Sequence, residues 1–305
     1  MSFKLLTYRI ERDSAARAGI LIDGRVIDCA TALRGSLDDS IDTTSTLALV
    51  QNWDTALPAL DAVETGAGHE SRPLGDVTLV APLLYPVNIF CAAANYQDHF
   101  REMTGRDVDK SKIKPYFFNK VARQTVIGTG QEVRKPQIVH KLDWEAEIAV
   151  VIGRSARNVK AANALDHVLG YTIINDLSAR DYLRRADWPA LASDWLWQKS
   201  FDTSAPMGPW ISLKRDIKDP QNLKINTWVN DTLEQDTHSK WMVFTVAEQI
   251  EALSEHFTLQ PGDVIATGTG GGVGNPKGKF LNPGDVCRIE IEGLGELVNR
   301  VVSGE

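Results

Sequence analysis

Cysteine is scarce in this chain, whose 305 residues contain only Cys29, Cys91 and Cys287. The three lie far apart and form no Cys-x-x-Cys pair, which argues against a disulfide framework. Each lies in an apolar or strand-like stretch. We therefore expect three buried free thiols in a reducing cytoplasm.

Long apolar runs and basic blocks are missing as well. No segment approaches the roughly eighteen apolar residues that a membrane span needs, and the apolar stretch at the N-terminus is too short for us to expect a signal peptide. A net charge of −7 argues against a nucleic-acid surface. The content of 43% hydrophobic and 24% charged residues is typical of a soluble globular protein. Neither a nucleic acid nor a membrane is an expected partner.

Strand and turn signals divide the chain into two parts. Short β-like runs fill residues 3–30, with the pair Asp23-Gly24 as a tight hairpin turn. A helical pattern follows at 44–64, and a polar, loop-like stretch at 65–73. These signals predict a small N-terminal α/β domain at 1–75 and a larger domain at 76–305.

The larger part is rich in strand-like runs, and we place two helices in it, at 160–168 and 245–257. The second begins at Thr245, with Glu248 three residues on, which is the spacing of a capping box. The fold class predicted is therefore α+β, mainly β.

Two glutamates, Glu145 and Glu147, stand at the start of the β-branched run 146–152. Residues i and i+2 of a strand point to the same face, so the two carboxylates lie side by side. Like charges held that close repel, and their burial needs compensation. A bound cation is the simplest remedy, although Glu-x-Glu is also common on the wet face of an edge strand.

A third carboxylate, Asp176, ends a second strand-like run at 170–176. Beside Asn175 it also fits a turn. If it joins the two glutamates, three oxygen ligands without Cys or His suit Mg²⁺ or Mn²⁺ better than Zn²⁺.

Three further segments carry candidate chemistry. His99 and Glu102 face one another if 95–102 is helical, and a carboxylate that orients an imidazole makes a general base, although an incidental surface pair has the same spacing. Lys199 precedes a turn-rich apolar stretch that allows burial against the carboxylates. The glycine-rich loop 266–274 is no P-loop, because no Gly-Lys-Ser/Thr follows, but its N–H groups suit an oxyanion.

Taken in order, these motifs resemble the fumarylacetoacetate hydrolase family. The matching motifs cover roughly residues 80–302 and lie at 95–102, 143–147, 170–181, 199–203 and 259–269, with Pro-Gly-Asp again at 283–285. The resemblance implies a β-rich sandwich or roll, usually dimeric, on which a 2-keto acid chelates a divalent cation.

The resemblance also implies roles for individual residues. Glu145, Glu147 and Asp176 would hold the cation. His99, oriented by Glu102, would activate water from a lid that orders over substrate, and Lys199, with Thr203 behind it, would polarise the site. Substrate binding would fall to Tyr96, Gly268 and Thr269.

Two positions depart from the family pattern. Leu183 stands where many members carry a substrate-contacting Gln, and Gly270 replaces a proline of the glycine loop. A Trp-rich segment at 188–197 suggests an unusual pocket wall or a dimer surface.

The first functional hypothesis is a metal-dependent hydrolase that cleaves a C–C bond in a 2,4-diketo acid, such as an acylpyruvate or a fumarylpyruvate-like acid. The alternative is a lyase or isomerase on the same scaffold, such as a 2-oxo acid decarboxylase, a hydratase or a dienoate isomerase. All begin from a chelated 2-keto acid, so the ligands do not discriminate them. A binding module without activity is the third hypothesis, and the full set of candidate catalytic residues argues against it.

Overall fold

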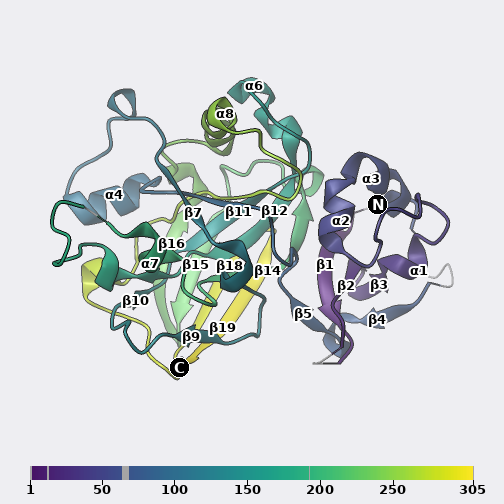
Figure 1. Ribbon diagram of the computed structural model, residues 1–305, viewed down its shortest axis with the longest axis horizontal. Coiled ribbons are helices and arrows are strands. Elements are labelled where there is room, and N and C mark those ends of the chain that lie inside the picture. Colours follow the sequence, from purple (N-terminus) through teal and green to yellow (C-terminus); the bar gives the residue numbers. More distant parts are fainter. Residues whose placement is uncertain (1, 12–13, 64–68, 192, 305) are drawn as a thin grey trace.

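A large β-sheet runs through both parts of the chain in the computed structural model, which describes residues 2–11, 14–63, 69–191 and 193–304 (Figure 1). Its twelve strands include a central path in the order β4-β3-β2-β1-β14-β12-β11-β17-β6-β7, with β5 paired to β1 and β8 to β14. These strands are β1 (Lys4–Arg9), β2 (Arg17–Ile22), β3 (Arg25–Asp28), β4 (Ser71–Pro73), β5 (Thr78–Val80), β6 (Ile89–Ala92), β7 (Phe117–Lys120), β8 (Val126–Ile127), β11 (Ala146–Ile152), β12 (Val168–Asn175), β14 (Ala205–Leu213) and β17 (Val264–Ala266).

A second sheet of five strands packs in the larger part of the molecule, in the order β16-β15-β18-β19-β9. A short two-stranded ribbon, β10-β13, lies beside the site described below. The strands are β9 (Val133–Lys135), β10 (Leu142–Asp143), β13 (Ser178–Ala179), β15 (Lys224–Val229), β16 (Thr232–His238), β18 (Val286–Ile291) and β19 (Gly295–Ser303). The fold is mainly β, as the sequence predicts.

The helices are short and lie around these sheets. They are α1 (Cys29–Ala32), α2 (Thr46–Gln51), α3 (Trp53–Asp61), α4 (Gln97–Thr104), α5 (Ala122–Thr125), α6 (Ala161–Ala164), α7 (Trp195–Lys199) and α8 (Val246–His256).

Helix α8 confirms the prediction at 245–257, because the Thr245 side chain accepts from the Glu248 N–H and the Glu248 side chain accepts from the Thr245 N–H. The predicted helix 160–168 is shorter: after α6 the chain tightens into a 3₁₀ turn at Leu165–His167 and enters β12.

The N-terminal part differs from its prediction in two places. The helix predicted at 44–64 is broken between α2 and α3 by Asn52, whose backbone leaves the helical region (φ −116°, ψ 33°). The loop predicted at 65–73 is wrong at its end, since β4 pairs with β3, while residues 64–68 lie outside the described part. The hairpin turn at Asp23-Gly24 is correct, and both residues have the positive φ that such a turn requires.

Strand pairing crosses the predicted boundary at residue 75. β1 pairs with β14 through Lys4↔Ser212 and Leu5↔Ile211, so the N-terminal strands extend the sheet of the larger part. One apolar core contains Phe3 and Leu5 together with residues of the larger part such as Met207. The division into 1–75 and 76–305 stays a prediction about folding units, and the sheet joins the two.

The two faces of β11 pack into different cores. Ala146, Ile148, Val150 and Ile152 belong to one cluster, whereas Ala149 and Val151 belong to the other. Glu145 and Glu147 precede Ala149 and Val151 in the odd-numbered row, so the strand places both glutamates on one face.

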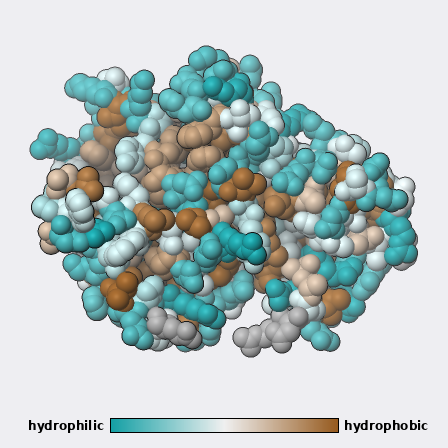
Figure 2. Space-filling model, viewed as in Figure 1, coloured by the Kyte–Doolittle hydropathy of each residue, from teal (hydrophilic) through white to brown (hydrophobic). Residues whose placement is uncertain are grey.

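The surface and the cysteines agree with a globular protein. Cys29, Cys91 and Cys287 are buried free thiols, as predicted. On the face shown in Figure 2, apolar residues form separate clusters between broad hydrophilic areas. Across the described ranges, no helix has the length and apolar character that crossing a membrane demands.

Candidate metal centre and active site

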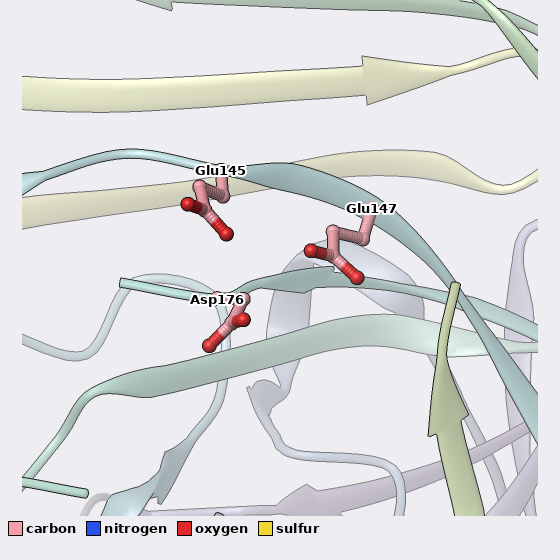
Figure 3. Close-up of side chains that lie close together, drawn as sticks. All are labelled: Glu145, Glu147 and Asp176. Carbon is pink, nitrogen blue, oxygen red and sulfur yellow. The ribbon is translucent and has the colours of Figure 1, made fainter. Parts of the chain in front are cut away.

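Three carboxylates meet where β11 begins and β12 ends (Figure 3). Glu145 precedes β11, Glu147 lies in it, and Asp176 directly follows β12. The antiparallel register Ala146↔Asn175 brings the two ends together, and the Asp176 N–H donates to the Glu145 carbonyl at 2.9 Å. One carboxylate oxygen from each residue lies within 4.8 Å of the other two. The structure therefore assembles the trio that the sequence predicts.

Glu145 is the most heavily paired member of the trio. Its carboxylate accepts from Lys199 Nζ at 2.8 Å and from Arg180 Nη2 at 2.5 Å. Burial opposes ionisation, but Lys199 and Arg180 hold the pKa of Glu145 well below its usual range. This carboxylate is therefore negatively charged at neutral pH.

Asp176 is held between two buried lysines. Lys120 Nζ donates to its Oδ1 at 2.7 Å, and Lys199 Nζ donates to its Oδ2 at 2.7 Å. Both lysines are almost fully buried, at 1% and 2% exposed. Buried ammonium groups need such partners, because desolvation otherwise disfavours the charged form.

Glu147 differs from its two neighbours because no basic side chain in the described part of the chain forms an ion pair with it. Its carboxylate accepts instead from a backbone group, the Gly268 N–H, which donates to Oε2 at 2.7 Å. Burial, Asp176 and Glu145 raise the pKa of Glu147 well above its usual range. Among the described residues, Glu147 is thus the carboxyl of the trio that lacks a basic partner.

The balance of acidic and basic groups fits a bound cation. Four acidic groups, Glu145, Glu147, Asp176 and the buried Asp143, lie beside three buried basic groups, Lys120, Lys199 and Arg180, so one carboxyl lacks a basic partner. The donor set is all oxygen, which suits Mg²⁺ or Mn²⁺ and not a thiolate-preferring metal. Glu145, Glu147 and Asp176 would hold the ion.

His99 lies on α4 with its ring buried and its Nδ1 3.5 Å from Glu102 Oε2. This separation is long for a hydrogen bond, and Nδ1 has no other partner in the described part. The Gly272 N–H donates to Glu102 Oε2 at 3.1 Å. Burial alone would raise the pKa of Glu102, but His99 and the Gly272 N–H lower it below its usual value. The pair predicted from the sequence therefore exists, in a loosely joined form.

The segment after His99 is anchored to the rest of the molecule at two points. The Gln97 side chain bonds both the N–H and the carbonyl of Val108, at 2.9 and 3.0 Å. Lys110 forms an ion pair with Glu248 on α8 at 2.7 Å. Closure of this segment over substrate stays a prediction.

The glycine loop supports the metal ligands directly. Gly268 has a φ of +95°, and a Cβ there would lie 2.8 Å from the Asn95 Cβ, so only glycine fits. Its N–H is already held by Glu147. The Thr269 hydroxyl donates to the Ala146 carbonyl at 2.9 Å and accepts from Gln235 at 2.9 Å.

A cavity of about 190 Å³ opens beside these groups. It brings together His99, Glu145, Lys199 and Thr269, but Tyr96 and Gly268 are not among its lining residues, so their substrate-binding roles stay predictions. The lining residues are Ala92, Ala93, Ala94, His99, Met103, Phe118, Glu145, Arg180, Leu183, Trp195, Gln198, Lys199, Thr269, Val273, Asn275 and Pro276.

The sequence analysis does not identify two basic residues of the site, Arg180 and Lys120, and it assigns the hydroxyl behind Lys199 to the wrong residue. Arg180 joins Asp143 to Glu145, and its position within the motif at 170–181 was the available signal. Lys120 ends the apolar strand β7, where a lone lysine is a signal for a buried partner. The hydroxyl that supports Lys199 is that of Ser204, which donates to the Lys199 carbonyl at 2.9 Å, whereas Thr203 accepts from the Arg134 N–H.

The fold and this acidic site are those of a known family of enzymes. The family model described as fumarylacetoacetate (FAA) hydrolase C-terminal matches residues 88–302. The chain belongs to the fumarylacetoacetate hydrolase family, as its motifs predict.

Curated relatives within this family cover most of the chain. Oxaloacetate tautomerase FAHD2B, mitochondrial, from Homo sapiens is 40% identical over 232 residues, which are 75% of this chain and 71% of that protein. Oxaloacetate tautomerase fahd2, mitochondrial, from Xenopus laevis is 35% identical over 306 residues, 99% of this chain and 91% of that protein.

Solved structures show the same fold over the whole chain, which confirms the predicted fold class. Maleylpyruvate hydrolase from Sphingobium sp. SYK-6, in complex with manganese(II) ion and pyruvate, has a TM-score of 0.78 and 28% identity, covering 99% of this chain and 100% of that one. Fumarylacetoacetate hydrolase from Exiguobacterium antarcticum has a TM-score of 0.80 and 31% identity, with the same coverage.

Proposed function

We propose that this protein is a divalent-metal-dependent isomerase that interconverts the enol and keto forms of oxaloacetate or a closely related 2-oxo dicarboxylic acid. The observation that carries the proposal is the 40% identity over three quarters of the chain to a protein named oxaloacetate tautomerase. The carboxylate trio and the adjacent small cavity are consistent with it.

The chemistry needs a stabilised enolate oxygen and a group that moves one proton between oxygen and carbon. When bound, Mg²⁺ or Mn²⁺ supplies a Lewis acid that polarises the substrate oxygens. Lys199 lines the cavity and contributes an ammonium group that is fixed by its ion pairs with Glu145 and Asp176. Such preorganised charge stabilises the negative charge that develops on the substrate oxygen.

His99 is the proposed proton carrier. Nδ1 faces Glu102, so we assign the ring hydrogen of the neutral imidazole to it, which leaves the other ring nitrogen, Nε2, as an acceptor. That nitrogen would take the proton from one position of the substrate and return it to another, because tautomerisation consumes no water. The apolar wall formed by Met103, Leu183 and Val273 would limit the access of bulk water.

The second candidate is a C–C hydrolase, which is the first functional hypothesis from the sequence. Its support is the similarity to maleylpyruvate hydrolase, whose structure contains manganese and pyruvate, and the His99–Glu102 pair, which suits water activation. Both reactions begin from a 2-oxo acid, so the trio alone does not separate them.

One assay distinguishes the two functions. The purified protein with Mg²⁺ or Mn²⁺ is mixed with enol-oxaloacetate, and the enol absorbance and the released pyruvate are followed together. We expect the enol to disappear faster than it does without protein, with no pyruvate formed, and EDTA to remove the acceleration. An acylpyruvate is tested in parallel. If the protein releases pyruvate from it and has no effect on enol-oxaloacetate, the isomerase proposal is wrong and the hydrolase takes its place.

We also propose a homodimer. Trp188, Leu191, Leu196 and Trp197 are each more than half exposed, and an interface would cover such large apolar side chains. Light scattering in solution tests the homodimer, and a measured mass equal to that of a single chain would refute it.

A cytoplasmic location stays a prediction from the sequence.

A further inference from the structure

The side chain of Gln198 is buried without a hydrogen-bond partner. The residue is 0% exposed, and neither Oε1 nor Nε2 has a partner within the described part of the chain. Buried amides are nearly always bonded, because an unsatisfied polar group loses its hydration without compensation. This amide therefore needs an explanation.

Gln198 lies directly before Lys199 on α7 and lines the same cavity as Glu145, Arg180 and Lys199. The charged groups there are engaged with one another: Lys199 bonds Glu145, and Arg180 bonds both Glu145 and Asp143. The Thr269 hydroxyl is used by backbone and Gln235. Gln198 thus brings unused hydrogen-bonding capacity to the cavity wall.

The neighbouring wall does not use that capacity. Leu183 and Trp195 line the same cavity and have no carboxylate or carbonyl side chain to offer. Trp195 is fixed by stacking on Phe118, with ring centroids 4.6 Å apart. An amide whose hydrogen bonds are unmade binds best to a ligand that brings its own oxygen atoms.

The backbone that carries Gln198 is rigid. The Asp194 side chain caps α7 by accepting from the Trp197 N–H at 3.0 Å, and the Gln198 N–H donates to the Asp194 carbonyl at 2.9 Å. Ser204 holds the Lys199 carbonyl at the other end. Such support presents the amide in a fixed place, which lowers the entropy lost on binding.

We propose that Gln198 is a specificity residue, whose Nε2–H₂ donates to the distal carboxylate of a 2-oxo dicarboxylic acid. The chelating 2-oxo acid end then lies at the carboxylate trio, and the other end reaches the amide. A neutral amide donates to a carboxylate without adding charge to a site that already holds three cations. The inference deepens the proposed function, on which it rests, and names the residue that recognises the second carboxylate of the substrate.

The test uses two acids of equal length, oxaloacetate and 2-oxobutanoate, in which a methyl group replaces the distal carboxylate. Binding to the Mn²⁺-loaded protein is followed by the fluorescence of tryptophan, because Trp195 lines the cavity. The variant is Gln198→Met, which keeps the side-chain volume and removes the donor. We expect oxaloacetate to bind roughly 10–100-fold more weakly to the variant, with 2-oxobutanoate unchanged.

Two controls keep the result interpretable. Gln198→Met should melt at or above the wild-type temperature, since it removes an unsatisfied amide. Gln198→Glu, whose carboxylate repels the distal carboxylate, should weaken oxaloacetate binding at least as much and again spare 2-oxobutanoate. If Gln198→Met weakens the binding of both acids equally, or of neither, Gln198 does not recognise the distal carboxylate and the inference is wrong.

The outcome also separates this inference from the isomerase proposal. If the wild-type protein prefers oxaloacetate in binding and Gln198→Met removes that preference, but no tautomerisation is seen, Gln198 keeps its role and the isomerase is wrong. If tautomerisation is normal and Gln198→Met leaves the preference unchanged, the isomerase stands and the role of Gln198 is wrong. A wild-type protein that binds neither acid refutes both.

Discussion

Glu145 and Glu147 occupy the same face of one strand, yet their partners predict effects of very different size for the same substitution. Glu145 is bonded to Lys199 and Arg180, whereas Glu147 accepts from one backbone N–H and has no basic partner in the described residues. We therefore expect Glu145→Gln and Glu147→Gln to differ sharply in metal-free protein, although both remove one proposed metal ligand.

Glu145→Gln breaks buried ion pairs and leaves two cations short of a partner. Such a loss costs about 3–5 kcal/mol of unfolding free energy, which corresponds to a fall of about 5–8 °C in melting temperature for a protein of this size. Glu147→Gln breaks no ion pair, and its amide oxygen can still accept from the Gly268 N–H. Its cost should stay within about 1 kcal/mol.

Added metal should reveal the shared role of the two residues. At a hundred times its dissociation constant, a ligand stabilises the wild-type protein by about 2.7 kcal/mol. That increment should vanish in both variants. Thermal unfolding of the wild type and both variants, in EDTA and in excess Mn²⁺, measures these values, with Asp54→Asn, from an exposed ion pair, as the surface control. Equal destabilisation of the two variants without metal would refute the assignment of partners, and an intact increment in either variant would refute its role as a metal ligand.

Three other substitutions test separate parts of the structure. Lys120→Met should lower stability by about 3–5 kcal/mol, because it removes one of the two buried lysines that pair with the buried Asp176. Lys110→Met, in an exposed pair, should cost at most about 1 kcal/mol, and urea unfolding compares the two variants. His99→Ala should lower kcat by about 10²–10⁴-fold with Mn²⁺ affinity unchanged. Glu102→Gln should lower kcat by a smaller factor. If His99→Ala also abolished Mn²⁺ binding, His99 would be a metal ligand. Thr245→Ala should destabilise the protein by about 1 kcal/mol through the lost cap, and a thermal shift near zero would contradict the capping box.

The parts of the site that the sequence predicts are those governed by local rules. The i, i+2 geometry of a strand places Glu145 and Glu147 on one face whatever surrounds them. The capping box at Thr245 is equally local, and the structure contains both of its hydrogen bonds. The order of the motifs then indicated Asp176 as the third carboxylate.

The parts that the sequence misses depend on distant partners. Lys120 meets Asp176 across 56 residues, and no local pattern pairs them. The joining of β1 to β14 links Lys4 with Ser212, so the continuity of the sheet across residue 75 follows from tertiary pairing. The break at Asn52 was missed for another reason: the apolar spacing of α2 and α3 continues through it, whereas the backbone turns there.

The binding of Mn²⁺ to the purified protein, followed by electron paramagnetic resonance, tests the metal centre most directly. We expect the protein to deplete the signal of free Mn²⁺ by one equivalent per chain and oxalate to change the signal of the bound ion. Glu147→Gln should abolish the depletion, while Glu102→Gln should leave it intact. Wild-type protein that leaves the free Mn²⁺ signal unchanged, or a Glu147→Gln variant that still takes up one equivalent, would contradict the assignment of Glu145, Glu147 and Asp176 as metal ligands.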